Sequence, residues 1–181
     1  MTDSPWEGLL GAARAGAEWA WSDLYRSLAP KVRGYAVAQG VSDPDGVVGD
    51  VFLQVARNLA SFNGDEAGFR SWVFTIAFRR IVDERRRTGR RLEDPTDRIP
   101  DSGTDAPAAE DVALGRMASE SMTQALALLT TEQRQVLGLR ILADLSVDEV
   151  AVIIGKRPGA VKALQRRAIA TLRRNLDEAV S

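Results

Sequence analysis

The sequence predicts an all-α protein in which two small helical domains are joined by a flexible acidic linker. Apolar residues recur at the three- and four-residue spacing of amphipathic helices, and no segment sustains the alternation of a β-strand. The tract Gly89–Asp111 holds three prolines and few apolar residues, which is typical of a linker. We therefore expect domains at residues 1–88 and 112–181, a linker at 89–111, and a helix-turn-helix in the second domain.

The first two helices are expected in the opening forty or so residues. The first covers Trp6–Ala20, and the second begins at Ser22 and ends near Gln39, immediately before Gly40. Pro30 lies within the second helix. Because proline lacks an amide hydrogen, it is expected to kink that helix or to mark a helix start.

Two more helices complete the first domain. The sequence Ser42-Asp43-Pro44-Asp45 has the acids of a helix N-terminus, and the apolar stripe that follows it continues to about Ala60. A loop at Asn63-Gly64-Asp65 separates this helix from the fourth, which is expected over Phe69–Arg87.

The second domain is expected to resume the helical pattern at Val112. Thr130 provides an N-cap for a helix over Glu132–Ala143. In Leu145–Arg174 a short apolar helix ends at Gly155 and a second helix begins at Pro158. A helix, a glycine-containing turn and a second helix form the layout of a helix-turn-helix, whose second helix enters the DNA major groove.

Charge is strongly segregated along the chain, although the net charge is only −1. Seven arginines lie in Arg79–Arg91, and seven acids follow in Leu92–Asp111. Gly155–Arg174 then carries seven basic residues and no acid. Two basic blocks separated by an acidic tract indicate nucleic-acid binding by both domains.

Composition excludes several classes of function. The chain has no cysteine and no histidine, so it has no thiol nucleophile, no Cys-ligated metal and no Ser-His-Asp triad. We expect no enzyme activity, no metal and no cofactor. No apolar run approaches the roughly 20 residues that span a bilayer, and the N-terminal segment is acidic. We expect a soluble, cytoplasmic protein without membrane insertion.

Three stretches resemble a bacterial RNA polymerase sigma factor of the extracytoplasmic-function (ECF) type: DLYRSLAPKVRGYA, SFNGDEAGFRSWVFTIAFRRIVDERRR and the segment from ALALLTTEQRQ to IATLRR. The resemblance covers nearly everything from Ser22 to Leu176 except the linker. It implies that the chain binds the polymerase core, recognises two promoter elements and helps to open the DNA. The first domain would read the minus-ten element and the second the minus-thirty-five element. Members of this family are often held inactive by an anti-sigma factor, although no segment here identifies one.

The resemblance also supplies candidate residues on the minus-ten side. Phe62 and Asn63 match the loop that holds a flipped base in the family. Asp83, Arg86 and Arg87 match its D-x-x-R pattern, and Asp83 is spaced to pair with the arginines on either side of it. The full candidate set is Phe62, Asn63, Arg79, Arg80, Asp83, Arg86 and Arg87.

The recognition helix offers the candidates for the minus-thirty-five side. Its apolar positions are expected to face inward, and its polar positions to face base edges or phosphates. The inward residues are Val161, Leu164 and Ala168, and the DNA-binding candidates are Arg157, Lys162, Gln165, Arg166 and Arg167.

The third helix resembles the polymerase-binding surface of the family but departs from its usual pattern, D-A-E-D-V-V-Q-E-V-F. Gly46 replaces an acid and Gly49 a glutamine, and each glycine costs about 0.5–1 kcal/mol relative to alanine in a helix. Core binding would then be weaker or depend more on the remaining polar residues. The core-binding candidates are Asp45, Asp50, Phe52 and Gln54.

Two other functions stay open from the sequence. A stand-alone helix-turn-helix repressor or activator would use symmetric operators and a dimerisation surface, and it leaves the Arg79–Arg91 domain without a role. A nucleic-acid-processing enzyme is disfavoured because the chain lacks His, Cys and a clustered carboxylate motif.

A linker of about 20 residues reaches at most about 70 Å. That is about two turns of B-DNA, which suits a bipartite promoter.

Overall fold

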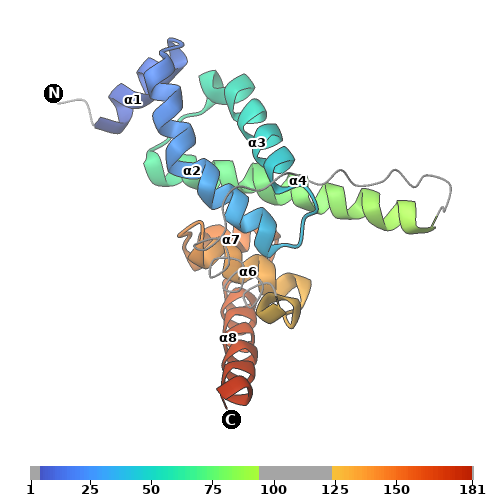
Figure 1. Ribbon diagram of the computed structural model, residues 1–181. Coiled ribbons are helices and arrows are strands. Elements are labelled where there is room, and N and C mark those ends of the chain that lie inside the picture. Colours follow the sequence, from blue (N-terminus) through green and yellow to red (C-terminus); the bar gives the residue numbers. More distant parts are fainter. Residues whose placement is uncertain (1–4, 94–123, 181) are drawn as a thin grey trace.

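The computed structural model describes residues 5–93 and 124–180 of the chain (Figure 1). Within these ranges every regular element is a helix, so the all-α prediction is confirmed. The elements are α1 (Pro5–Arg14), α2 (Glu18–Ala38), α3 (Pro44–Asn58), the 3-10 turn η1 (Leu59–Ser61), α4 (Glu66–Glu93), α6 (Thr131–Ile141), α7 (Val147–Ile154) and α8 (Pro158–Val180).

The boundary between the first two helices lies earlier in the chain than the sequence predicted. Helix α1 ends at Arg14 and not at Ala20, because Gly16 has a φ of +83° that only glycine adopts without strain. Helix α2 then begins at Glu18 and continues through Pro30, which is exposed and starts no helix. The prediction that the second helix ends before Gly40 is confirmed, since Gly40 has a φ of +73°.

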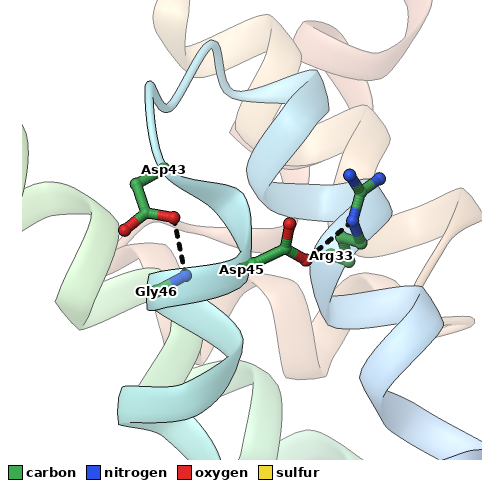
Figure 2. Close-up of polar contacts among 4 residues, drawn as sticks. All are labelled: Arg33, Asp43, Asp45 and Gly46. Atoms are coloured by element: carbon green, nitrogen blue, oxygen red, sulfur yellow. Dashed lines mark hydrogen bonds and ion pairs between the residues drawn. The ribbon is translucent and has the colours of Figure 1, made fainter. Parts of the chain in front are cut away.

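Helix α3 starts at the predicted cap. The Gly46 amide donates to Asp43 Oδ1 at 2.8 Å (Figure 2), which satisfies one of the free amides of the first turn. A Cβ at Gly46 would lie 2.2 Å from Asp43 Oδ2. The glycine that stands where the family has an acid therefore leaves room for the cap in the conformation seen here.

Helix α4 is longer than predicted at both ends. It begins at Glu66, after Asp65 Oδ1 accepts a hydrogen bond from the Gly68 amide at 2.8 Å. It continues to Glu93, so residues 89–93, which we assigned to the linker, are helical. A glycine in a helix costs only about 1 kcal/mol, and the next proline is Pro95. The rest of the predicted linker, and the segment from Val112 to residue 123, lie outside the described residues.

The core of the first domain forms where α2, α3 and α4 pack together. Tyr35, Phe69 and Phe74 are the largest fully buried side chains. In the second domain α6 and α7 pack against α8. The inward residues predicted for α8 are confirmed: Val161, Leu164 and Ala168 are all buried.

The two domains lie against each other in this structure. Helices α6 and α7 contact α2 and α4, while α8 extends away from the first domain (Figure 1). Helices α6 and α2 approach each other closely, since a Cβ at Gly138 would lie 2.6 Å from the Tyr35 ring. Glycine at position 138 therefore permits the contact between the domains.

Candidate nucleic-acid interface

A hollow lies beside the loop that joins α3 to α4. Asn63 is exposed and Phe62 is half-buried. The Phe62 ring stacks on Trp72, with centroids 5.1 Å apart and planes 22° from parallel. Both loop residues that we singled out therefore line one surface, together with Gln54, which we had assigned to polymerase binding. The hollow is lined by Gln54, Asn58, Ser61, Phe62, Asn63 and Trp72.

The Phe62 ring belongs to a cluster of aromatic side chains. Phe69 is buried and meets Phe62 edge-on at a centroid distance of 5.4 Å. Trp6 of α1 packs against Phe69 at 5.1 Å. Phe69 is therefore a core residue, and nothing in the sequence indicated that Trp6 would join this cluster. Phe62 is thus held by rings from α1 and α4.

The basic block on α4 divides between surface and interior. Arg79, Asp83, Arg86 and Arg87 are exposed. Arg80 is half-buried, and it forms an ion pair with Asp50 of α3 and not with Asp83 as expected. The minus-ten candidate Arg80 and the polymerase-binding candidate Asp50 are therefore partners in this structure.

Arg85, from the same block, points inward. Its Nη2 donates to the Gln39 carbonyl oxygen at 2.5 Å and to Gln39 Oε1 at 3.2 Å. Burial lowers the pKa of Arg85, the nearby Arg134 lowers it further, and Tyr35 acts in the opposite direction. Burial also raises the pKa of the Tyr35 hydroxyl, and Arg85 partly offsets this rise.

Four side chains form a buried polar cluster where the two domains meet: Tyr35, Gln39, Arg85 and Arg134. Gln39 is the C-cap of α2, Arg85 is on α4 and Arg134 is on α6. Four of its polar atoms are buried without a hydrogen-bond partner among the described residues: Tyr35 Oη, Gln39 Nε2, Arg85 Nη1 and Arg134 Nε.

The polymerase-binding candidates on α3 occupy different environments. Asp45 Oδ1 pairs with Arg33 Nε at 2.9 Å, and both side chains are exposed (Figure 2). Phe52 is only 7% exposed and lies beneath the Tyr25 ring, with centroids 4.7 Å apart. Exposed apolar side chains on these two helices include Tyr25 of α2, which is 47% exposed, and Leu53 of α3, which is 50% exposed. Sequence reasoning missed both, because an amphipathic pattern does not show which apolar residues stay uncovered.

The helix-turn-helix has the predicted geometry. Ser146 and Glu149 form a capping box at the start of α7, and Gly155 ends this helix with a φ of +67°. Arg157, Lys162, Arg166 and Arg167 are exposed.

Three polar contacts connect α6 to this motif. Arg140 of α6 donates through Nε to Gln165 Oε1 at 3.4 Å and through Nη1 to the Leu145 carbonyl. Lys156 Nζ, in the turn between α7 and α8, pairs with Glu132 Oε1 at 2.8 Å. Gln165, a candidate for reading bases, is therefore engaged by a side chain of its own domain.

Other kinds of site are missing from the part of the chain that the structure describes. There, no group of three or more Asp or Glu side chains is placed to hold a metal ion. Nor does any helix in residues 5–93 and 124–180 have the length and apolar character needed to cross a membrane.

Comparison with known protein families gives two matches. The family model for Sigma-70 region 2 matches residues 24–91, and the model for Sigma-70, region 4 matches residues 119–172. The first range contains α3, the loop and most of α4, and the second contains the helix-turn-helix.

Individual proteins are similar over most of the chain. The ECF RNA polymerase sigma factor RpoE of Cereibacter sphaeroides is 30% identical over 185 residues, covering 97% of this chain and 99% of that protein. The ECF RNA polymerase sigma factor BldN of Streptomyces coelicolor is 30% identical over 172 residues, covering 94% of this chain but 65% of the longer relative. The sigma factor RpoE in a co-crystal structure with the anti-sigma factor NepR from Bartonella quintana has the same fold, with a TM-score of 0.67 at 22% identity over 86% of this chain and 96% of that one.

Proposed function

The chain belongs to the sigma-70 family as an RNA polymerase sigma factor of the ECF type, and we propose that it initiates transcription through two separate DNA-binding surfaces. The first consists of the loop 59–65 and the exposed face of α4, and it recognises the minus-ten element. The second is the exposed face of α8, and it recognises the minus-thirty-five element. The boundaries 1–88, 89–111 and 112–181 are the proposed extents of the two domains and the linker, with the helical residues 89–93 extending the first domain.

The observation that carries this proposal is the hollow beside Phe62 and Asn63. Taking a base out of the duplex costs a few kcal/mol. Stacking of a base on an aromatic ring contributes about 1–3 kcal/mol. The hollow is lined by the rings of Phe62 and Trp72, which stack on each other and so leave one face each for a base. The amide of Asn63 supplies a donor and an acceptor for the edge of a base. The loop has the chemical groups needed to hold an extruded base.

The exposed face of α4 supplies the contact with the DNA backbone. Arg79, Arg86 and Arg87 lie on this helix, which follows the loop directly. Neutralisation of phosphates by such residues supplies affinity that falls as salt rises. Arg80 joins them when its ion pair with Asp50 opens, because an exposed pair of this kind is worth only about 0–1 kcal/mol.

On α8 we assign the reading of bases to Lys162, Gln165 and Arg166. Arginine and lysine suit the acceptors of guanine, and glutamine suits adenine. Gln165 becomes available when it exchanges its contact with Arg140, which at 3.4 Å is long for a hydrogen bond. Arg157 and Arg167 flank this set and suit phosphates.

For the polymerase core we propose a surface on α2 and α3. It combines the exposed apolar side chains of Tyr25 and Leu53 with the polar residues Asp45, Asp50 and Gln54. Phe52 contributes by supporting Tyr25 from below, since it is itself almost fully covered.

We infer that the domains separate when both DNA surfaces are in use. In this structure α6 and α7 cover part of α2 and α4, and a linker of about 20 residues reaches up to about 70 Å. Separation would let the two surfaces bind one face of the DNA about two turns apart.

This role defines the other properties that we propose. The protein acts in the cytoplasm, where bacterial transcription takes place, and it regulates the polymerase without performing chemistry itself. An anti-sigma factor is a proposed partner, because the structurally similar RpoE of Bartonella quintana was crystallised with the anti-sigma factor NepR.

The test is transcription by RNA polymerase core, with and without the purified chain, on a library of promoter fragments, followed by mapping of the transcripts. We expect new transcripts whose start sites share elements near minus ten and minus thirty-five. DNA binding without any promoter-specific initiation would contradict this proposal and favour a stand-alone repressor.

A further inference from the structure

Helix α1 lies outside the matched Sigma-70 region 2, which begins at residue 24, yet it is bonded to the candidate minus-ten loop. Arg14 donates through Nε to the Leu59 carbonyl oxygen at 3.3 Å and through Nη2 to the Phe62 carbonyl oxygen. Trp6 donates through Nε1 to the Gly64 carbonyl oxygen at 2.9 Å. Three carbonyls of the segment 59–64 are thus bound by two side chains of α1.

These hydrogen bonds fix geometry more than they stabilise the fold. Two of the three are exposed, where water would serve the same carbonyls almost equally well, so that each contributes little net stability. Water molecules, unlike the side chains of α1, would not connect segment 59–64 rigidly to the helix. The planar guanidinium of Arg14 holds several donors in a fixed fork and so joins both ends of the η1 turn, at Leu59 and Phe62.

The ring contacts act on the same residue. The Trp6 ring packs on Phe69, and Phe69 packs on Phe62. A Cβ at Gly64 would lie 2.9 Å from Phe62 Cζ, so the backbone that Trp6 holds passes directly beside the Phe62 ring. Helix α1 therefore contacts the Phe62 backbone directly through Arg14, and it reaches the Phe62 ring indirectly, from Trp6 through Phe69.

We propose that α1 is a positioning element for the minus-ten site, in which Arg14 and Trp6 hold segment 59–64 so that Phe62 and Asn63 are preset around the hollow for the extruded base. Neither Arg14 nor Trp6 touches DNA in this arrangement. The inference rests on the proposed function and assigns a role to a helix that the region 2 match does not include. Presetting the loop removes an ordering cost that binding would otherwise have to offset.

The decisive variants are Arg14→Lys and Arg14→Ala. Lysine keeps the positive charge but has no planar fork to join two carbonyls. Full-length chains are assembled with RNA polymerase core, and binding is measured to the single-stranded minus-ten segment of a promoter mapped as above, over a range of salt concentrations. We expect both variants to bind about threefold to tenfold more weakly, the range for a side chain that must be ordered on binding, with an unchanged salt slope.

Two further variants control for charge and for folding. Arg57→Ala removes an exposed arginine from the last turn of α3 and is expected to leave minus-ten binding unchanged. Trp6→Phe keeps a ring against Phe69 but has no N–H donor, and it is expected to weaken binding by about twofold to threefold. All variants should retain wild-type binding to duplex minus-thirty-five DNA and should be folded at the assay temperature, as judged by thermal melting.

Two results would overturn the inference. If Arg14→Lys binds as wild type while Arg14→Ala weakens binding and lowers the salt slope by about 1, then Arg14 contacts a phosphate directly. If neither Arg14 variant changes binding, α1 does not position the loop. Failure of the proposed function is distinguishable, because Asn63→Ala would then also leave minus-ten binding unchanged.

Discussion

The two ends of the first domain differ in exposure and in how their polar groups are satisfied. At the loop end, Asn63 is exposed and the carbonyls of segment 59–64 accept hydrogen bonds from α1. At the other end, Tyr35 and Gln39 are buried against α6 and still have polar atoms without partners among the described residues.

This difference distinguishes the contacts that we expect to persist on binding from those that we expect to open. Each buried polar group that lacks a partner costs about 1–3 kcal/mol, so the covered end carries a penalty that hydration would relieve. The loop end carries no such penalty at the carbonyls that α1 binds. We therefore expect the loop to keep its conformation when DNA and polymerase bind, and the contact between the domains to open.

The largest effect is expected when the contact between α6 and Tyr35, at the covered end of the first domain, is disrupted. Gly138→Ala places a Cβ about 2.6 Å from the Tyr35 ring, and overpacking of this kind costs about 1–3 kcal/mol. The population should shift toward separated domains. The measurement is the distance between fluorophores on α3 and α8 in the free protein, which should increase.

Gly49→Ala is the matched control for this experiment. Gly49 also lies within a helix, but a Cβ there meets nothing within 4 Å, so only helix propensity changes. An unchanged fluorophore distance in Gly138→Ala would mean that the interface adapts to the extra methyl group, and the contrast between the two ends would be lost.

A smaller effect is expected from a substitution on α8, which lies outside the first domain. Arg166→Ala should weaken binding to duplex minus-thirty-five DNA by about 1 kcal/mol, roughly fivefold, because it removes an exposed cation that we assign to the reading of bases. Polymerase binding should be unaffected when measured by assembly with core. Equal loss of polymerase association would show that Arg166 does not act through DNA.

The smallest effect is expected at the ion pair between α6 and the turn of the helix-turn-helix. Glu132→Gln removes the partner of Lys156, and a largely exposed pair contributes about 0.2–1 kcal/mol. Chemical denaturation should show a loss of unfolding free energy within this range and smaller at high salt. A larger loss would mean that the pair organises the turn, and the second domain would then be less independent than we infer.

Local signals in the sequence predicted much of the fold. Gly40 and Gly155 end helices, and Asp43 and Thr130 cap them, because a cap depends on residues only a few positions apart. The inward side of α8 followed from helical periodicity in the same way. Gly16 offered a similar stop signal, and the prediction of a single helix over Trp6–Ala20 overlooked it.

Contacts between distant parts of the chain were beyond such reasoning. Nothing near Arg14 in the sequence indicates that it bonds to Leu59 and Phe62, and nothing near Gly138 indicates that Tyr35 packs on it. Arg85 looked like part of a DNA-binding block because its neighbours are basic, yet it lies half-buried beside Gln39. Charge patterns locate a basic helix, but packing decides which of its arginines reach the surface.

The most direct test of the central claim follows the minus-ten base itself. The fluorescent base analogue 2-aminopurine is placed at each minus-ten position of a mapped promoter, and its emission is followed as polymerase forms the open complex with wild-type or Asn63→Ala chain. Asn63 is exposed, so its loss should leave stability and minus-thirty-five binding unchanged. We predict that one position changes its emission as the base leaves the stack, and that this change is largely lost with Asn63→Ala. Equal changes with both chains would contradict the claim that the loop beside α1 holds the extruded base.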